Sequence, residues 1–162
     1  MIYFDYTATT KPKKELLDLH TRINEEYWCN TEGMYNQGVK AHMLLDKSSN
    51  VIIDTLKLKN KKVLFTSGAT EANNTAIYGV CSAYYNEPKH IITTYLEHAS
   101  VLNVYKKIKK RGFKVTYLIP NKEGIIDVSK LEKSITNDTV LISIMWVNNI
   151  IGTIQPINEV IN

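Results

Sequence analysis

The chain has 162 residues, of which 44% are hydrophobic and 22% charged. This balance is typical of an ordinary globular domain and excludes a collagen, a disordered segment or a disulfide scaffold. The net charge of +4 comes from scattered basic residues, apart from a cluster at 106–111, which favours a solvated helix end over a nucleic-acid interface.

No apolar run is long enough to span a bilayer, and Asp5 lies where a signal peptide would need basic residues. We therefore expect a cytoplasmic protein with neither a membrane nor a nucleic-acid partner. Cys29 and Cys81 show no CxxC spacing and have no pair of histidines nearby, so we expect no metal site and two unpaired thiols.

The amino-terminal part predicts two helices and a strand. Pro12 can open the first helix. Its inner apolar stripe is Leu16, His20, Ile23 and Tyr27. A second helix over about 38–58 follows a polar loop, and VLFT at 63–66 predicts a buried strand.

From there the apolar pattern alternates between helix and strand. Strands are expected at 90–94, 114–118 and 139–147, with helices around 76–84, 101–108 and 128–135. The last strand is apolar on both faces, which predicts a central position in the sheet. The alternation predicts an α/β fold with a mostly parallel sheet and helices on both faces.

Pro156 opens one more apolar stripe, which is shorter than two helical turns. A last strand without its covering helix would leave apolar surface and an open edge. We therefore expect the chain to be the front part of a larger unit.

The first candidate site is the junction after the strand at 63–66, where Ser67, Gly68 and Thr70 precede a helix. Ligands bind at the carboxyl ends of strands in open α/β sheets, and the first amides of a helix attract anions. The segment matches neither the Walker pattern nor GxGxxG. The alternative is that Ser67 and Thr70 are simple helix caps.

His98 and the pair Asn148 and Asn149 follow two further strands. If the strands are neighbours, these side chains reach the same crevice as Thr70. The alternatives are that His98 is a helix cap or core residue, and that the asparagines form a tight turn before Gly152.

Several segments, taken in order, resemble the amino-terminal part of the cysteine desulfurases. They are IYFDYTATT at 2–10, FTSGATEANN at 65–74, HIITTYLEHASVL at 90–102, VTYLIPNKEGIID at 115–127 and DTVLISIMWVNNIIGTIQPI at 138–157. Cysteine desulfurases are pyridoxal-phosphate enzymes of the class-V aminotransferase-like family. The resemblance implies that residues 1–162 form part of one fold-type I large domain, with no second domain.

The resemblance also implies roles for particular residues. Ala69 and Thr70 would hold the cofactor phosphate, and Asn149 would contact the ring's 3-hydroxyl. His98 would lie against the pyridine ring and place an imidazole for proton transfer. The implied reaction converts L-cysteine to L-alanine and leaves a persulfide on an enzyme cysteine, for iron–sulfur cluster assembly or tRNA thiolation. A homodimer and a sulfur-acceptor protein are the implied partners.

The sequence departs from the family pattern in several places. Ile150 replaces the acid of the Asn-Asn-Glu-x-Gly motif, and NTEGMYN at 30–36 lacks the Pro and His of the corresponding family loop. The Schiff-base Lys, the Asp that pairs with the pyridinium nitrogen and the nucleophilic Cys have no counterpart, since Cys29 and Cys81 fall elsewhere in the pattern. We therefore expect an inactive, truncated chain. The alternatives are a non-catalytic remnant complemented by a second polypeptide and, more weakly, a fragment of a selenocysteine lyase-like enzyme.

Overall fold

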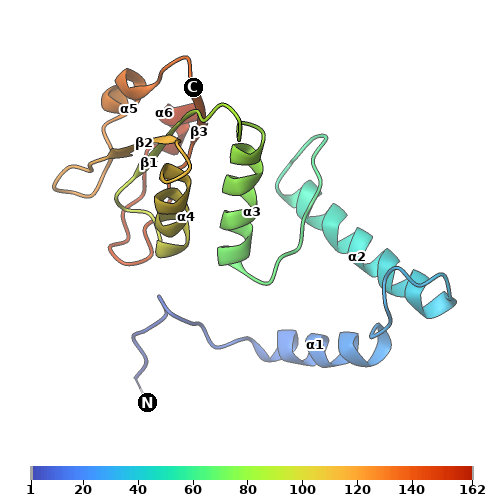
Figure 1. Cartoon of the computed structure of the whole chain (residues 1–162). Coiled ribbons are helices and arrows are strands. Elements are labelled where there is room, and N and C mark those ends of the chain that lie inside the picture. Colours follow the sequence, from blue (N-terminus) through green and yellow to red (C-terminus); the bar gives the residue numbers. More distant parts are fainter. Residues whose placement is uncertain (1, 162) are drawn as a thin grey trace. The chain divides into compact units, whose positions relative to one another are not determined.

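A computed structural model describes residues 2–161 (Figure 1). The chain divides into two compact units, with the boundary in the sequence between Phe65 and Thr66. The first unit contains two helices, α1 (Lys14–Glu26) and α2 (Asn36–Thr55). The helix predicted over 38–58 is therefore confirmed, with both ends two or three residues earlier.

The predicted inner stripe of α1 is wrong in this unit, because Leu16 and His20 are exposed and no residue of α1 is buried. Two helices without a second apolar layer cannot cover such a stripe. The backbone approaches closely at Gly38, where an added Cβ would lie 2.4 Å from the backbone oxygen of Gly33. Only glycine fits this close approach between α2 and the preceding loop.

The buried strand predicted at 63–66 is also wrong. These residues form no strand, and Leu64 and Phe65 are exposed. A strand exists only where a neighbour completes its hydrogen-bond ladder, and within residues 2–161 no strand pairs with this segment.

The second unit is an α/β structure, as predicted. Its elements are α3 (Ala69–Ser82), β1 (His90–Thr94), α4 (Ala99–Lys109), β2 (Lys114–Leu118), α5 (Val128–Ser134), β3 (Thr139–Ile142) and α6 (Ile157–Ile161). The strands form a parallel sheet in the order β2-β1-β3. The prediction of a long central strand at 139–147 is wrong. The strand β3 ends at Ile142 and lies at the edge of this sheet, where it is only half-buried.

The side chains of β1 divide between two cores, one on each face of the sheet. Ile91 packs into a cluster with Ile77 of α3 and Val104 of α4. Ile92 packs into a second cluster with Leu131 of α5, against which Val160 of α6 also lies. Both isoleucines are fully buried, so the prediction of helices on both faces is confirmed.

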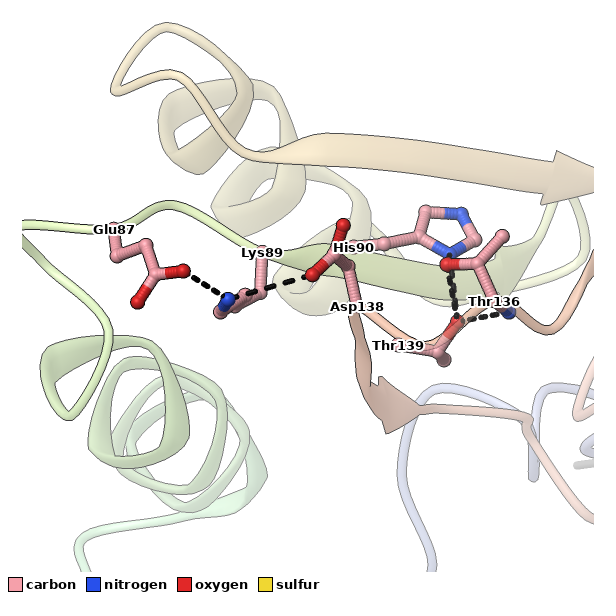
Figure 2. A network of polar contacts seen from close by, with 6 residues as sticks. All are labelled: Glu87, Lys89, His90, Thr136, Asp138 and Thr139. Carbon is pink, nitrogen blue, oxygen red and sulfur yellow. Dashed lines mark hydrogen bonds and ion pairs between the residues drawn. The ribbon is translucent and has the colours of Figure 1, made fainter.

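At the amino end of β1, a buried histidine joins the three strands (Figure 2). His90 Nδ1 lies 2.8 Å from the hydroxyl of Thr139 on β3, and Nε2 lies 2.8 Å from the hydroxyl of Thr116 on β2. A hydroxyl can donate or accept, so a neutral imidazole satisfies both contacts in either tautomer.

Beside His90, the ammonium group of Lys89 bonds to the carboxylates of Glu87 and Asp138, and the bond to Asp138 measures 3.4 Å (Figure 2). This pairing raises the pKa of Lys89, with Glu87 the larger cause. Lys89 therefore joins the start of β1 to the turn before β3, at the end of the sheet opposite the candidate site.

His90 should make the stability of this unit depend on pH. Burial lowers its pKa from 6.5, and the nearby charge of Lys114 lowers it further, although Asp138 opposes this. The unfolded chain binds the proton near pH 6.5, whereas the folded chain binds it only at lower pH. The stability that His90 contributes is therefore complete above pH 6.5 and is lost as pH falls through the folded pKa. Urea unfolding of His90→Gln should show a smaller loss of stability on acidification than the natural chain, whereas exposed His20→Gln should match it. Equal slopes for His90→Gln and the natural chain would contradict this assignment.

A buried amide side chain organises the loop before α5. Gln155 donates from Nε2 to the backbone oxygen of Gly124 at 2.7 Å and accepts from the amide of Ile126 at 2.9 Å. Gly124 has a φ of +76°, and an added Cβ would lie 2.8 Å from Cδ1 of Ile151. The backbone conformation therefore favours glycine, and a methyl group at this position would displace the end of the exposed Ile151 side chain.

Gly152 provides a matched comparison for Gly124, because its φ is +72° but an added Cβ would meet nothing within 4 Å. Gly152→Ala should cost only the left-handed backbone conformation, about 1–2 kcal/mol of unfolding free energy. Gly124→Ala should cost up to about 1 kcal/mol more, because the end of the Ile151 side chain and the methyl group of Thr153 must also shift. Urea unfolding measures both values, and equal costs would contradict the close packing at Gly124.

Candidate functional site

The carboxyl ends of two neighbouring strands define the candidate site. β1 and β3 are parallel, with Ile92 opposite Ile142, so the residues that follow them emerge at the same edge of the sheet. Segment 95–98 continues from β1 and leads into α4, and segment 143–149 continues from β3. These two segments carry His98 and Asn149.

Glu97 ties the two segments together. Its side chain is buried, and Oε1 accepts from the hydroxyl of Thr94 at 3.0 Å and from the backbone amide of Met145 at 2.7 Å. Burial raises the pKa of Glu97, although both hydrogen bonds oppose the shift. A buried carboxylate that accepts from a backbone amide holds the two segments at a fixed separation.

Asn148 supplies a second connection and also shapes the turn. Its Nδ2 donates to the backbone oxygen of Leu96 at 3.0 Å, and its Oδ1 accepts from the amides of Ile150 and Ile151 at 2.9 and 3.0 Å. The turn interpretation is therefore confirmed for Asn148, which is buried. Asn149 lies on the same turn with its side chain exposed.

His98 is the N-cap of α4, as the cap alternative predicted. Its Nδ1 accepts from the amide of Ser100 at 3.1 Å and lies 2.9 Å from the hydroxyl of Ser100. That hydroxyl accepts from Nδ2 of Asn73 on α3 at 2.9 Å. The rest of the imidazole is exposed, so the cap leaves the outer part of the ring available to a ligand.

The amino end of α3 provides donors for an anion. Its N-cap, Gly68, makes no side-chain cap, and an added Cβ there would meet nothing within 4 Å. The amides of the first turn have no acceptor within the helix, and the exposed hydroxyl of Thr70 adds a donor. This donor set and open space fit a phosphate monoester.

One acidic side chain lies in this first turn, but it is turned back toward the preceding loop. Glu71 Oε2 accepts from the amide of Ser67 at 2.6 Å, and this bond lowers the pKa of Glu71. Ser67 is therefore not the helix cap that the sequence allowed. Its amide instead donates to the carboxylate of Glu71.

Helix packing joins α3, which carries Thr70, to α4, which His98 caps. Asn73, which contacts Ser100 beside His98, lies one helical turn after Thr70 on α3, and α3 packs side by side with α4 (Figure 1). Asn149 is placed through its neighbour Asn148, which contacts Leu96. The roles of Asn73, Ser100 and Glu97 were missed by sequence reasoning, and the only available signal was a carboxylate directly before a candidate histidine.

Other reactive side chains lie away from this edge. Lys89 and Lys114 are at the amino end of the sheet. Cys81 lines a cavity of about 420 Å³ with Tyr78 and Arg111, and burial raises the pKa of its thiol, so it is a protonated core residue at neutral pH. Across residues 2–161, no group of three His, Cys, Asp or Glu side chains could hold a metal ion. Within the same range, every helix is too short or too polar to pass through a bilayer.

Comparison with known proteins places this architecture in a family. The profile of the class-V aminotransferases (Aminotransferase class-V) matches residues 2–162, and the chain belongs to this family. Similar curated relatives are the NifS/IcsS protein homolog of Lactobacillus delbrueckii subsp. bulgaricus, with 44% identity over 99% of this chain, and the cysteine desulfurase IscS of Buchnera aphidicola subsp. Acyrthosiphon pisum, with 42% identity over 98%. The resemblance to the cysteine desulfurases is therefore confirmed.

Solved structures agree with this assignment. The structure named "SspA in complex with cysteine" matches with a TM-score of 0.92 and 36% identity. The match covers 98% of this chain and 46% of the SspA chain. A "NIFS-LIKE PROTEIN" matches with a TM-score of 0.94 and 33% identity. The match covers 99% of this chain and 44% of the chain of that protein. The chain spans 42% and 40% of the two curated relatives.

Substitution of Glu97 tests the connection between the two segments. Glu97→Ala leaves the amide of the half-buried Met145 without an acceptor and should cost about 1–3 kcal/mol of unfolding free energy. Glu97→Gln keeps an acceptor oxygen and carries no buried charge, so it should cost less. Chemical unfolding at neutral pH measures both, and equal losses would show that the acceptor oxygen is unimportant.

Proposed function

We propose that this chain is the amino-terminal part of a cysteine desulfurase large domain and that it supplies one side of a pyridoxal-phosphate site. The observation that carries the proposal is the uncapped amino end of α3, with open space beside Gly68 and the hydroxyl of Thr70 at its first turn. The histidine cap of the neighbouring helix α4 lies beside it, joined through Asn73 and Ser100. These groups match the phosphate and the aromatic ring of one ligand.

Each residue has a distinct role in this proposal. The amides of Ala69 and Thr70, together with the Thr70 hydroxyl, hold the phosphate group. The ring of His98 lies against the pyridine ring, and the carboxamide of Asn149 contacts its 3-hydroxyl. Pyridoxal phosphate, when bound, supplies the electron sink that the amino-acid chemistry needs. The chain's own contribution is to bind and orient the cofactor.

The substrate and partners follow from the relatives. One structural neighbour is described as being in complex with cysteine, and several relatives are named cysteine desulfurases. We infer that L-cysteine is the substrate of the complete site, that alanine is released, and that the sulfur passes through an enzyme persulfide to an acceptor protein. Assembly as a homodimer belongs to the same proposal.

The isolated chain is inactive in this proposal. A cysteine desulfurase also needs a lysine, an aspartate and a nucleophilic cysteine around the cofactor, and no residue of 1–162 matches their sequence context. Lys89 and Lys114 lie at the opposite end of the sheet, and Cys81 is buried. Incubation with pyridoxal phosphate and cysteine should yield neither sulfide nor alanine, and steady turnover would contradict this.

A second candidate function is that of an interaction protein completed by another polypeptide. The observation that favours it is a set of exposed apolar side chains beside the turn that carries Asn149, namely Trp146, Val147, Ile150, Ile151 and Ile154. A patch of this kind marks an interaction surface. Co-purification with a polypeptide that carries the lysine and cysteine segments would support this function, and a folded monomer without such a partner would count against it.

Thr70→Val tests the proposed phosphate site without relying on activity. Valine keeps the shape of threonine but removes the hydroxyl donor, so pyridoxal phosphate should bind about five- to tenfold more weakly, equivalent to about 1 kcal/mol. Thr75→Val is the matched control, because Thr75 is exposed further along α3, and it should not change binding. Fluorescence titration measures both, and equal affinities for all three chains would contradict the assignment of Thr70.

A further inference from the structure

We propose that Ser100 and Asn73 are positioning residues that hold the His98 imidazole in one tautomer, with its proton on Nε2. The consequence is that the neutral ring offers a hydrogen-bond donor, and not a lone pair, at its outer nitrogen. The inference about the ring rests on hydrogen bonds within this chain. Only its relevance to a bound ligand rests on the function proposed above.

A backbone amide contacts the inner nitrogen of the His98 imidazole. The amide of Ser100 lies 3.1 Å from Nδ1 of His98 and meets the geometric criteria of a hydrogen bond. An amide N–H can only donate, so Nδ1 must be the acceptor and carries no proton. A neutral imidazole has a single N–H, which therefore lies on Nε2.

The hydroxyl group of Ser100 also contacts this nitrogen. Ser100 Oγ lies 2.9 Å from Nδ1 of His98 and 2.9 Å from Nδ2 of Asn73. Because the amide group of Asn73 donates to this oxygen, the hydroxyl hydrogen is free to point toward Nδ1. The direction of donation runs from Asn73 to Ser100 to His98, and the amide and the hydroxyl of Ser100 share the single lone pair of Nδ1.

The residues that support the imidazole are less exposed than His98 itself. Ser100 is buried, with 9% of its surface exposed, and Asn73 is half-buried, whereas His98 is exposed. Within residues 2–161, the imidazole of His98 makes its hydrogen bonds through Nδ1. The inner nitrogen is thus held by Ser100 of α4, which Asn73 of α3 contacts in turn, and the outer N–H is available to an acceptor atom of a ligand.

The arrangement also defines what the neutral ring can do. Its lone pair is directed at the first turn of α4, so a neutral His98 cannot accept a proton from a ligand at Nε2. It can donate a hydrogen bond there and fix the orientation of the ligand. Asn73 and Ser100 touch no ligand in this proposal and act only through the imidazole.

The test is a ¹⁵N-histidine NMR measurement on the full chain without cofactor, at a mildly alkaline pH where imidazoles are neutral. His98→Gln identifies the His98 signals. A single Nε2–H tautomer gives widely separated Nδ1 and Nε2 shifts, whereas a free histidine peptide gives shifts averaged between the two tautomers. We expect the natural chain to show a wider separation than the peptide. An averaged pair, or a proton on Nδ1, would overturn the proposal.

Variants test the two positioning residues. Ser100→Ala and Asn73→Ala should each narrow the separation of the His98 shifts, and Ser100→Thr, which keeps the hydroxyl, should restore it. Asn74→Ala is the matched control, because Asn74 bonds to the backbone oxygen of Thr70 and not to this network. Unchanged shifts in both Ser100→Ala and Asn73→Ala would overturn the roles of these residues.

This result is independent of the proposed function. If the chain binds no pyridoxal phosphate but His98 shows the Nε2–H tautomer, the cofactor site is refuted and the positioning network stands. If the cofactor binds but the tautomers are averaged, the positioning network is refuted and the cofactor site stands. Circular dichroism of each variant confirms that the chain is folded before its NMR shifts are compared.

Discussion

Every feature of the candidate site depends on the pairing of one buried strand with a neighbour on each side. β1 is covered on both faces and is hydrogen-bonded along both edges, so its backbone has no contact with water. Burial of Ile91 and Ile92 stabilises the unit by about 1.5–3 kcal/mol each. Because the strand is fixed in all directions, the residues after Thr94 start from a defined position. A loop that begins at such a point can hold functional side chains accurately.

The site is built outward from that strand by a few buried polar contacts. Glu97 reaches across to the amide of Met145, and Asn148 reaches back to Leu96. On the other side, Ser100 and Asn73 join the starts of α4 and α3. Of the exposed groups, His98 is held by the buried Ser100, and Asn149 directly follows the buried Asn148. This division between buried supporting residues and exposed ligand-facing residues is typical of a preorganised site.

The sequence allowed a good prediction of regular elements in the second unit, because helix and strand periods are local properties. β1 and β2 were predicted with their observed ends. The strand at 63–66 was predicted incorrectly, since its apolar pattern carries no information about whether a neighbour is present. The strand at 139–147 failed for a related reason, because its apolar residues continue past Ile142, where β3 ends. His98 and Asn148 were identified as candidates, but their hydrogen-bond partners could not be, because contacts such as Asn73 to Ser100 depend on helix packing.

The buried carboxylate of Glu97, after β1, fixes the position of the segment that follows β3. Hydrogen exchange of the Met145 backbone amide tests it most directly, because this amide lies outside every strand and its hydrogen-bond acceptor is Glu97. We expect the amide to exchange almost as slowly as those of β1, since both are released only when the unit opens. Exchange as fast as that of an exposed loop amide would show that the two segments are not held together and would contradict the account.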